Sequence, residues 1–349
     1  MIGETLGAYK VVSRLGAGGM GEVYLAQHTR IDRRAAIKVL LPELSSNQEV
    51  VDRFFSEARA TSTIHHRGIV EVLDCDVHPS GRAYIVMELL EGESLAGRLA
   101  RDKTFGRDLD RVLAVTGAIA DALGAAHAKG IVHRDLKPDN VFLVNDPGAP
   151  FGFLVKILDF GIAKLMSGEV DGKVSARTRT GSLMGTPAYM SPEQCRGASR
   201  VDHRTDIYSL GCIVYEMLAG RLPFVYEGFG EIISAHMSEA PPAFAAVGLE
   251  APPAVEAWTR KLLAKSPAER PATMADVVAT LREMQAGAGL KLTTWPTGMA
   301  PPGPSAAAKT TLSDHATASA ANPVPRRRRV PIAIGALAVV GVAGAVLKL

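Results

Sequence analysis

Cysteine is scarce in this chain of 349 residues, and its few cysteines are not spaced as pairs. Cys75, Cys195 and Cys212 are odd in number, and no two of them have the C-x-x-C spacing. This pattern predicts neither a disulfide framework nor a zinc site. It indicates a reducing compartment such as the cytosol.

An excess of charge of either sign is also missing. Lysine and arginine number 39 against 36 aspartates and glutamates, and the block Arg326–Arg329 accounts for the whole excess. The remaining chain is close to neutral, so its charge gives no reason to expect nucleic-acid binding. Residues 1–10 lack the apolar core of a signal peptide, and no internal repeat is visible.

What the chain does contain is the run HRDLKPDN at His133–Asn140, followed by Asp159 in an Asp-Phe-Gly turn. The run puts Asp135, Lys137 and an asparagine on one short loop, and the turn adds a second carboxylate. Phosphoryl transfer from ATP needs one carboxylate to orient the attacking hydroxyl, a cation for the transferring phosphate and oxygen ligands for magnesium.

These motifs resemble those of the eukaryotic-type protein kinases, and Lys137 resembles the serine/threonine branch. The resemblance implies an α+β fold with a strand-rich N-terminal lobe and a mainly helical C-terminal lobe. It also implies that Asp135 orients the substrate hydroxyl, Lys137 steadies the γ-phosphate, and Asn140 and Asp159 bind Mg²⁺ or Mn²⁺. ATP and protein substrates would be the reactants. A composition rich in alanine, glycine, arginine and proline is typical of GC-rich bacteria, where such kinases are common.

Near the N-terminus, Gly16, Gly18 and Gly21 have the G-x-G-x-x-G-x-V spacing. Glycine allows the backbone to approach phosphates closely. Dinucleotide-binding folds have similar glycines, but there a helix should follow. Here two β-prone segments follow, at residues 23–26 and 35–41, so we expect a strand–turn–strand hairpin over ATP.

The segment Ala36–Val39 resembles the V-A-I-K strand whose lysine, here Lys38, contacts the α- and β-phosphates. Its apolar neighbours indicate a buried strand, and a buried ammonium needs a carboxylate partner. We expect that partner to be Glu57, in a helical pattern that resembles the family's αC helix. Three other acids are weaker alternatives because they lie in a loop or near the helix start, where acids favour the dipole: Glu43, Glu49 and Asp52.

A β-prone segment ending at Met87 runs into Glu88 and Leu90. By resemblance, Met87 lines the back of the adenine pocket and the backbones of Glu88 and Leu90 hydrogen-bond the adenine edge. An ordinary core role for Met87 is the alternative, since the adenine slot is itself apolar. The predicted nucleotide-binding residues are Leu15, Gly16, Ala17, Gly18, Gly19, Met20, Gly21, Glu22, Val23, Ala36, Lys38, Met87, Glu88, Leu90, Asn140 and Asp159.

Residues 161–185 are polar and basic and contain Thr178 and Thr180. This pair resembles the threonines that bacterial relatives carry at this spacing, so we expect them to be phosphorylation sites. Arg134 directly precedes the catalytic aspartate, the arrangement in which family members bind a phosphorylated activation loop. A loop with incidental hydroxyls, Ser182 among them, is the alternative.

Further positions have structural roles by resemblance. Thr186 would contact the catalytic loop, Asp206 would hold that loop from below, and Arg270 would form a buried ion pair with Glu193. Residues 145–152 depart from the family because they are longer than the usual tight turn. Their proline and glycine content predicts an extended hairpin loop away from the metal ligands, with no effect on chemistry.

We expect the kinase domain to run from Tyr9 to Met284. Residues 285–325 are rich in Ala, Pro, Ser and Thr and predict a disordered linker. After Arg326–Arg329, the uncharged stretch Val330–Leu347 is near the lower length limit for a transmembrane helix. The arginine block would keep the kinase on the cytoplasmic side. A buried core helix is the alternative.

The sequence therefore predicts a serine/threonine protein kinase, held at the inner membrane by a single span and activated by autophosphorylation between two copies. Two other interpretations remain. A pseudokinase scaffold is disfavoured because no catalytic position is substituted, and a small-molecule kinase is disfavoured by the GTPAYMSPE segment at residues 185–193.

Overall fold

The computed structural model describes residues 1–102, 105–160, 187–197 and 201–287. Its strands are β1 Thr5–Leu6, β2 Tyr9–Ala17, β3 Gly21–His28, β4 Arg34–Leu40, β5 Val72–Val77, β6 Ala83–Glu88, β7 Gly92–Ser94, β8 Val141–Asn145 and β9 Phe153–Ile157. Its α-helices are α1 Pro42–Ser45, α2 Gln48–Ser62, α3 Leu95–Arg101, α4 Leu109–His127, α5 Pro192–Cys195, α6 Arg204–Ala219, α7 Phe229–Ser238, α8 Pro253–Leu262 and α9 Met274–Gly287. Short 3₁₀ turns lie at Phe105–Arg107, Pro138–Asn140, Pro187–Tyr189, Phe244–Val247 and Pro267–Glu269.

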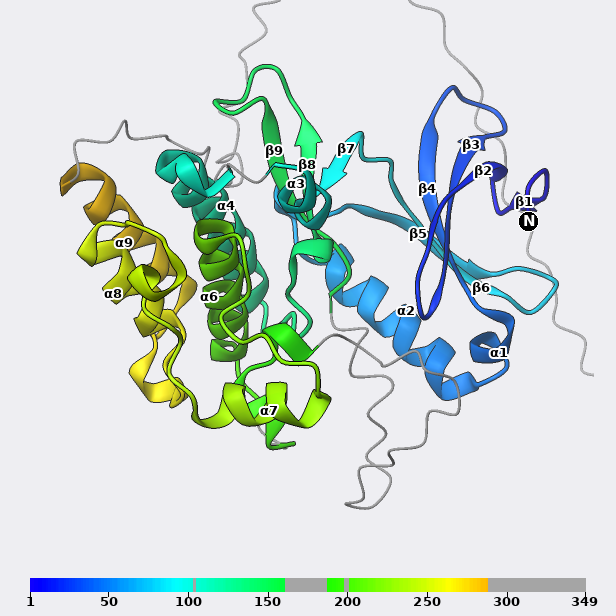
Figure 1. Cartoon of the computed structure of the whole chain (residues 1–349). Coiled ribbons are helices and arrows are strands. Elements are labelled where there is room, and N and C mark those ends of the chain that lie inside the picture. The colour runs from blue at the N-terminus through cyan, green and yellow to red at the C-terminus, as the bar shows by residue number, and fades with distance from the viewer. Residues whose placement is uncertain (103–104, 161–186, 198–200, 288–349) are drawn as a thin grey trace, which may run out of the picture. The chain divides into compact units, whose positions relative to one another are not determined.

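The N-terminal part is an antiparallel sheet in the order β1-β2-β3-β4-β6-β5 (Figure 1). Buried side chains form one cluster around Ile37 and Tyr84 and a second around Leu40 and Ile85. Neighbouring residues of β4 and β6 thus contribute to different clusters, because successive side chains of a strand point to opposite faces. Helix α2 packs against the second cluster.

Helix α2 begins at an asparagine cap, where the side chain of Asn47 accepts hydrogen bonds from the next two free backbone N–H groups. Val51, Phe54 and Ala58 lie on its buried face, at the spacing of one side of a helix. This packing fixes the helix that carries Glu57 against the sheet that carries Lys38.

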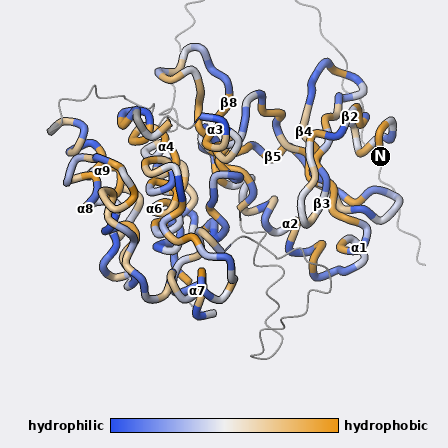
Figure 2. Tube along the Cα trace, viewed as in Figure 1, coloured by the Kyte–Doolittle hydropathy of each residue, from blue (hydrophilic) through white to orange (hydrophobic). Residues whose placement is uncertain are grey.

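The C-terminal part is mainly helical, and α4, α6, α8 and α9 pack around one large apolar core. Helix α6 is buried along almost its whole length, from Thr205 to Leu218. Figure 2 shows hydrophobic segments along the strands of the sheet and along α4. The two-lobed kinase architecture predicted from the sequence, with a strand-rich first part and a helical second part, is confirmed.

A small sheet, β7-β8-β9, is built from strands that precede and follow α3 and α4 in the chain, and β9 contacts the N-terminal part. Ile69, which precedes the N-terminal strand β5, forms a parallel bridge with Ile157 of β9. The backbone N–H of Ile157 donates to Gly68, and the N–H of Val70 donates back to Ile157, at 2.8 and 3.1 Å. The catalytic loop leads into β8 and the Asp-Phe-Gly turn follows β9, so both lie at the open end of the hairpin, where Val141 pairs with Ile157.

The extended loop predicted at residues 145–152 joins β8 to β9 and is closed by its own hydrogen bonds. The N–H of Asp146 donates to Gly152 at 3.0 Å, and the carboxylate of Asp146 accepts from Gly148 at 2.9 Å.

Helix α9 continues to Gly287, three residues past the predicted domain end at Met284, and Gln285 in this extra turn is 1% exposed. None of the described helices is both long and apolar enough to cross a bilayer. The predicted membrane segment Val330–Leu347, the arginine block and nearly all of the predicted linker lie outside the described residues.

Candidate active site

The catalytic loop is held by one buried carboxylate from α6. Asp206 is fully buried and accepts hydrogen bonds from the backbone N–H groups of His133 and Arg134, each at 2.8 Å. His127 Nε2 lies 2.8 Å from the same carboxylate. Arg134 has φ of 65°, a conformation that costs energy in a residue with a Cβ. The hydrogen bonds from Asp206 stabilise that conformation, as the resemblance implied for this residue.

Asp135 lies on this loop with two polar partners beside its carboxylate. Lys137 Nζ is 3.0 Å from Asp135 Oδ2, and Asn140 Nδ2 donates to the same oxygen at 3.2 Å. Asn140 Nδ2 also donates to the carbonyl of Asp135 at 2.8 Å. The structure therefore brings together the carboxylate, cation and amide that the sequence placed within eight residues.

Asp159 is brought next to this group by backbone contacts of its neighbour. The N–H of Leu158 donates to the carbonyl of Asn140 at 2.9 Å, and the Leu158 carbonyl lies 2.9 Å from His133 Nε2. Asp159 itself has φ of 44°, and Phe160 is buried against the ring of His133, with the ring centroids 4.9 Å apart.

Lys38 has a different partner from the one predicted. Its Nζ lies 2.8 Å from Asp159 Oδ1, and no ion pair with Glu57 is present among the described residues. Glu57 Oε2 is buried without a hydrogen-bond partner there. Burial raises the pKa of Glu57 to about 8, against the lowering effect of Lys38. The raised pKa means that the Glu57 carboxyl holds its proton more readily than a free glutamate does, and a neutral carboxyl attracts an ammonium less than a carboxylate does.

Strands β4 and β6, which carry several of the predicted nucleotide-binding residues, pair directly with each other. Ala36 lies opposite Met87, and Lys38 lies opposite Ile85. The backbone N–H of Glu88 donates to the carbonyl of Glu71 at 3.0 Å. A backbone hydrogen bond from Glu88 to adenine would therefore be made by the carbonyl of Glu88.

The glycine-rich segment forms the predicted hairpin between β2 and β3, and the N–H of Gly18 donates to the carbonyl of Gly21 at 2.8 Å. A Cβ at Gly21 would lie 2.2 Å from the carbonyl oxygen of Val39, so packing requires glycine there. A Cβ at Gly16 or Gly18 would have no described atom within 4 Å. Close approach to phosphate is a reason for glycine at those two positions.

Arg270 and Glu193 form the expected ion pair, with two nitrogen–oxygen distances of 2.7 and 2.8 Å. Sequence reasoning missed two supports of the catalytic loop, His127 and Gln194. Gln194 Nε2 donates to the carbonyl of Arg134 at 2.7 Å, and its Oε1 accepts from the backbone of Ser191. A Ser-x-x-Gln capping pattern was the available signal.

The predicted phosphorylation sites Thr178 and Thr180 and the contact residue Thr186 lie outside the described residues. Within those residues, Arg134 Nε is buried and has no hydrogen-bond partner.

The family described as protein kinase domain matches residues 9–280. The serine/threonine-protein kinase Pkn1 of Myxococcus xanthus is 45% identical over 276 residues, covering 79% of this chain and 38% of that protein. The serine/threonine-protein kinase PknA of Mycobacterium tuberculosis is 39% identical over 289 residues, covering 80% of this chain and 63% of that one. The chain thus spans less than two thirds of these relatives.

Among solved structures, the PknI kinase domain of Mycobacterium tuberculosis matches with a TM-score of 0.60 and 28% identity. The match covers 81% of this chain and 98% of that domain.

Proposed function

This chain belongs to the protein kinase family, and on that basis we propose that it transfers the γ-phosphate of ATP to serine and threonine hydroxyls of proteins. One observation carries the proposal. Lys137 and Asn140 both contact the carboxylate of Asp135 on a loop anchored by Asp206, and Lys38 pairs with Asp159. No position of the phosphotransfer set is substituted.

Asp135 would act on the attacking group. Its carboxylate accepts the hydrogen bond of the substrate hydroxyl and directs that oxygen at the γ-phosphorus. The new oxygen–phosphorus bond forms as the bond between the γ-phosphorus and its bridging oxygen breaks, with ADP as the leaving group. Lys137, 3.0 Å from Asp135, supplies a positive charge beside the transferring group.

The residues present fit a divalent cation. The described residues contain no cluster of three His, Cys, Asp or Glu side chains that could hold a metal ion. Mg²⁺ is usually bound by one or two protein oxygens together with substrate phosphates, so such a cluster is not required. Asn140 and Asp159 are kept adjacent by the Leu158–Asn140 hydrogen bond and would supply the protein oxygens. When bound, the ion neutralises charge on the phosphates.

Activation by phosphorylation of Thr178 or Thr180 is part of the proposal. Arg134 supports it, because its Nε is buried without a partner in the described residues and could donate to a phosphate. A phosphothreonine opposite this arginine would stabilise the catalytic loop through charge-assisted hydrogen bonds.

Tethering to the cytoplasmic membrane is the last part of the proposed function. Its support is the apolar stretch Val330–Leu347 directly after Arg326–Arg329. A flexible linker over the residues from 288 to 325 would have a reach of about 35 Å. Two anchored copies could then meet, and the anchor would raise their effective concentration for mutual phosphorylation.

The test of phosphotransfer is Asp135→Asn in the full-length chain, assayed with radiolabelled ATP and a generic protein substrate. The variant should bind ATP and unfold like the wild type, yet lose activity on the order of 10²–10⁴-fold, because amide nitrogen cannot accept the hydroxyl proton. Asp52→Asn, on the exposed side of α2, is the matched control and should keep full activity. Undiminished autophosphorylation of Asp135→Asn would contradict the assignment of Asp135 as a catalytic residue. Wild-type protein that binds ATP but phosphorylates nothing would favour the pseudokinase.

A further inference from the structure

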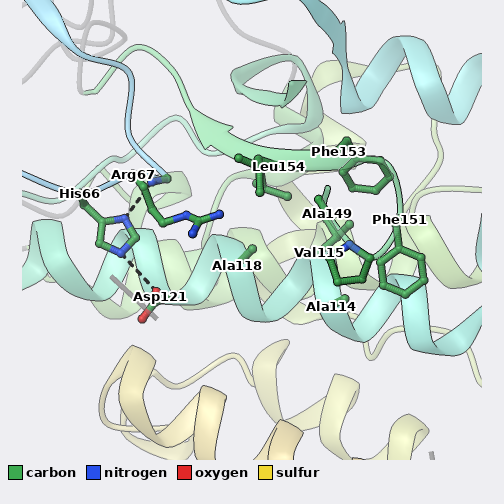
Figure 3. A pocket seen from close by; sticks show the side chains of 13 residues that line it. His66, Arg67, Ala114, Val115, Ala118, Asp121, Ala149, Phe151, Phe153 and Leu154 are labelled. Carbon is green, nitrogen blue, oxygen red and sulfur yellow. Dashed lines mark hydrogen bonds and ion pairs between the residues drawn. The ribbon is translucent and has the colours of Figure 1, made fainter. Parts of the chain in front are cut away.

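A small apolar pocket lies away from the catalytic residues, between α4 and the β8–β9 hairpin (Figure 3). Ala114, Val115 and Ala118 of α4 form its floor, and Phe151 and Phe153 of the hairpin form one wall. The opposite side is the segment before β5, where His66 is hydrogen-bonded to Asp121 of α4 at 3.2 Å.

The size of the pocket limits what can occupy it. Its volume is about 60 Å³. Sites for small-molecule ligands measure roughly 300–1,000 Å³, so this pocket suits apolar side chains of a peptide rather than a metabolite. Figure 3 shows the guanidinium of Arg67 pointing toward the space above Ala118. An arginine at the rim of an apolar site favours an aromatic ring, through a cation–π contact.

The hairpin wall is made by the segment that departs from the usual kinase pattern. Ala149, Pro150 and Phe151 belong to the long β8–β9 loop, which the phosphotransfer mechanism does not use. The loop's internal hydrogen bonds hold it in place, and the rings of Phe151 and Phe153 lie 6.4 Å apart. The long loop therefore adds a defined apolar surface beside α4.

The described chain ends close to this surface. Helix α9 runs antiparallel to α4 (Figure 1), and a Cβ at Gly124 would lie 3.5 Å from the Cβ of Met274 at the start of α9. At 1.5 Å per residue, the end of α9 at Gly287 is about 20 Å further along. That distance brings Gly287 to about the level of Arg111, roughly one helical turn from the floor residue Ala114.

The residues that follow have the chemistry the pocket requires. Leu290, Leu292 and Trp295 come three to eight positions after Gly287, in a region otherwise dominated by small and polar residues. We propose that the segment Leu290–Trp295 docks in this pocket of its own chain, with its apolar side chains against α4 and Phe151 and the indole against Arg67. An extended chain spans about 3.3 Å per residue, so the segment can reach from Gly287 around α4.

Cysteine cross-linking in the full-length chain tests the proposal. Ala149→Cys with Thr293→Cys should form a disulfide within one chain under mild oxidation, seen as a monomer of altered gel mobility. Ser80→Cys with Thr293→Cys is the control, because Ser80 is exposed on the β5–β6 turn, and should not cross-link. Burial raises the pKa of Cys195 to about 11 and also raises the pKa values of Cys75 and Cys212, so the native thiols react slowly.

Further variants separate the possible occupants. Leu292→Asp in the cross-linking pair should lower the yield about tenfold, because a charge cannot replace a buried leucine. Mixing the two single-cysteine chains should give no dimer. A cross-linked dimer would mean that a second copy occupies the pocket, and no cross-link would mean that an external partner or nothing does; either result overturns the proposal. Neither depends on phosphotransfer activity, so the two proposals fail separately.

Discussion

At the residue scale, the surroundings of Lys38 and Glu57 determine which carboxyl group pairs with the lysine and which one has a raised pKa. Lys38 neutralises Asp159 at 2.8 Å, and Glu57 stays buried and protonated on α2. A proton held by a buried acid makes folding depend on pH. Because the pKa of Glu57 is raised from 4.5 to about 8 in the folded chain, the folded state binds the proton more tightly than the unfolded state. Stability should therefore fall as pH rises from about 4.5 to about 8.

Replacing Glu57 removes this dependence. Glu57→Gln should gain stability relative to the wild type as pH rises from 5 to 8, since glutamine carries no charge to desolvate. Thermal unfolding at a series of pH values measures the difference. Glu49→Gln on the same helix is the control, because Glu49 is 82% exposed and its replacement should leave the profile parallel to the wild type. Parallel profiles for Glu57→Gln as well would show that Glu57 ionises normally.

At the scale of elements, the catalytic loop depends on α6 for its shape. Asp206 accepts two backbone hydrogen bonds from the loop and contacts His127, all inside the core. The positive φ of Arg134 would be unfavourable without them. The loop is therefore positioned by a residue more than sixty positions away.

Asp206→Asn should weaken the loop, because an amide has one acceptor oxygen where the carboxylate has two. We expect a loss of about 1.5–3 kcal/mol in the free energy of unfolding, the value of a hydrogen bond to a charged group. Denaturant unfolding measures it, and kcat should fall with it. Asp202→Asn, at the exposed start of α6, is the control and should cost about 1 kcal/mol or less. A variant as active and stable as the wild type would show that the loop is held by other contacts.

The activation segment, residues 161–185, is the second element with a testable role. Mass spectrometry of active enzyme should find phosphate on Thr178 or Thr180. The double variant Thr178→Ala/Thr180→Ala should lose most of its activity, because Arg134 then has no phosphate to bind. Ser182→Ala is the control on the same segment. Full activity of the double variant would place the switch elsewhere.

At the scale of the whole molecule, polar contacts join the strand-rich and the helical parts of the described chain. Lys156 of β9 pairs with Glu88 of β6, and the Ile69–Ile157 bridge lies beside them. The proposed attachment to the membrane depends on Arg326–Arg329 and Val330–Leu347, which lie outside the described residues.

Deleting Val330–Leu349 tests that placement. The full-length chain should fractionate with membranes and need detergent for extraction, whereas the truncated chain should be soluble. Catalysis on an added substrate should be unchanged, while autophosphorylation of dilute truncated protein should be slower, because the membrane no longer concentrates the copies. Deleting residues 301–320 of the linker is the control and should leave the chain on membranes. A full-length chain found in the soluble fraction without detergent would contradict the anchor.

Short motifs in the sequence, through their resemblance to a known family, predicted the fold and much of the site. HRDLKPDN places Asp135, Lys137 and Asn140 within six residues, so their contact needs only one loop. The apolar residues that flank Lys38 in β4 and the helical pattern around Glu57 in α2 indicated the elements that carry these two side chains. Such signals are local, because backbone geometry alone brings the residues onto one face.

Tertiary structure decided what depends on distance through space. In the folded chain Lys38 pairs with Asp159 and not with Glu57, and burial raises the pKa of Glu57. The supports from His127 and Gln194, and the pocket between α4 and the long β8–β9 loop, join segments far apart in the chain. No pattern within one segment specifies such contacts, since desolvation and packing depend on which elements the folded core brings together.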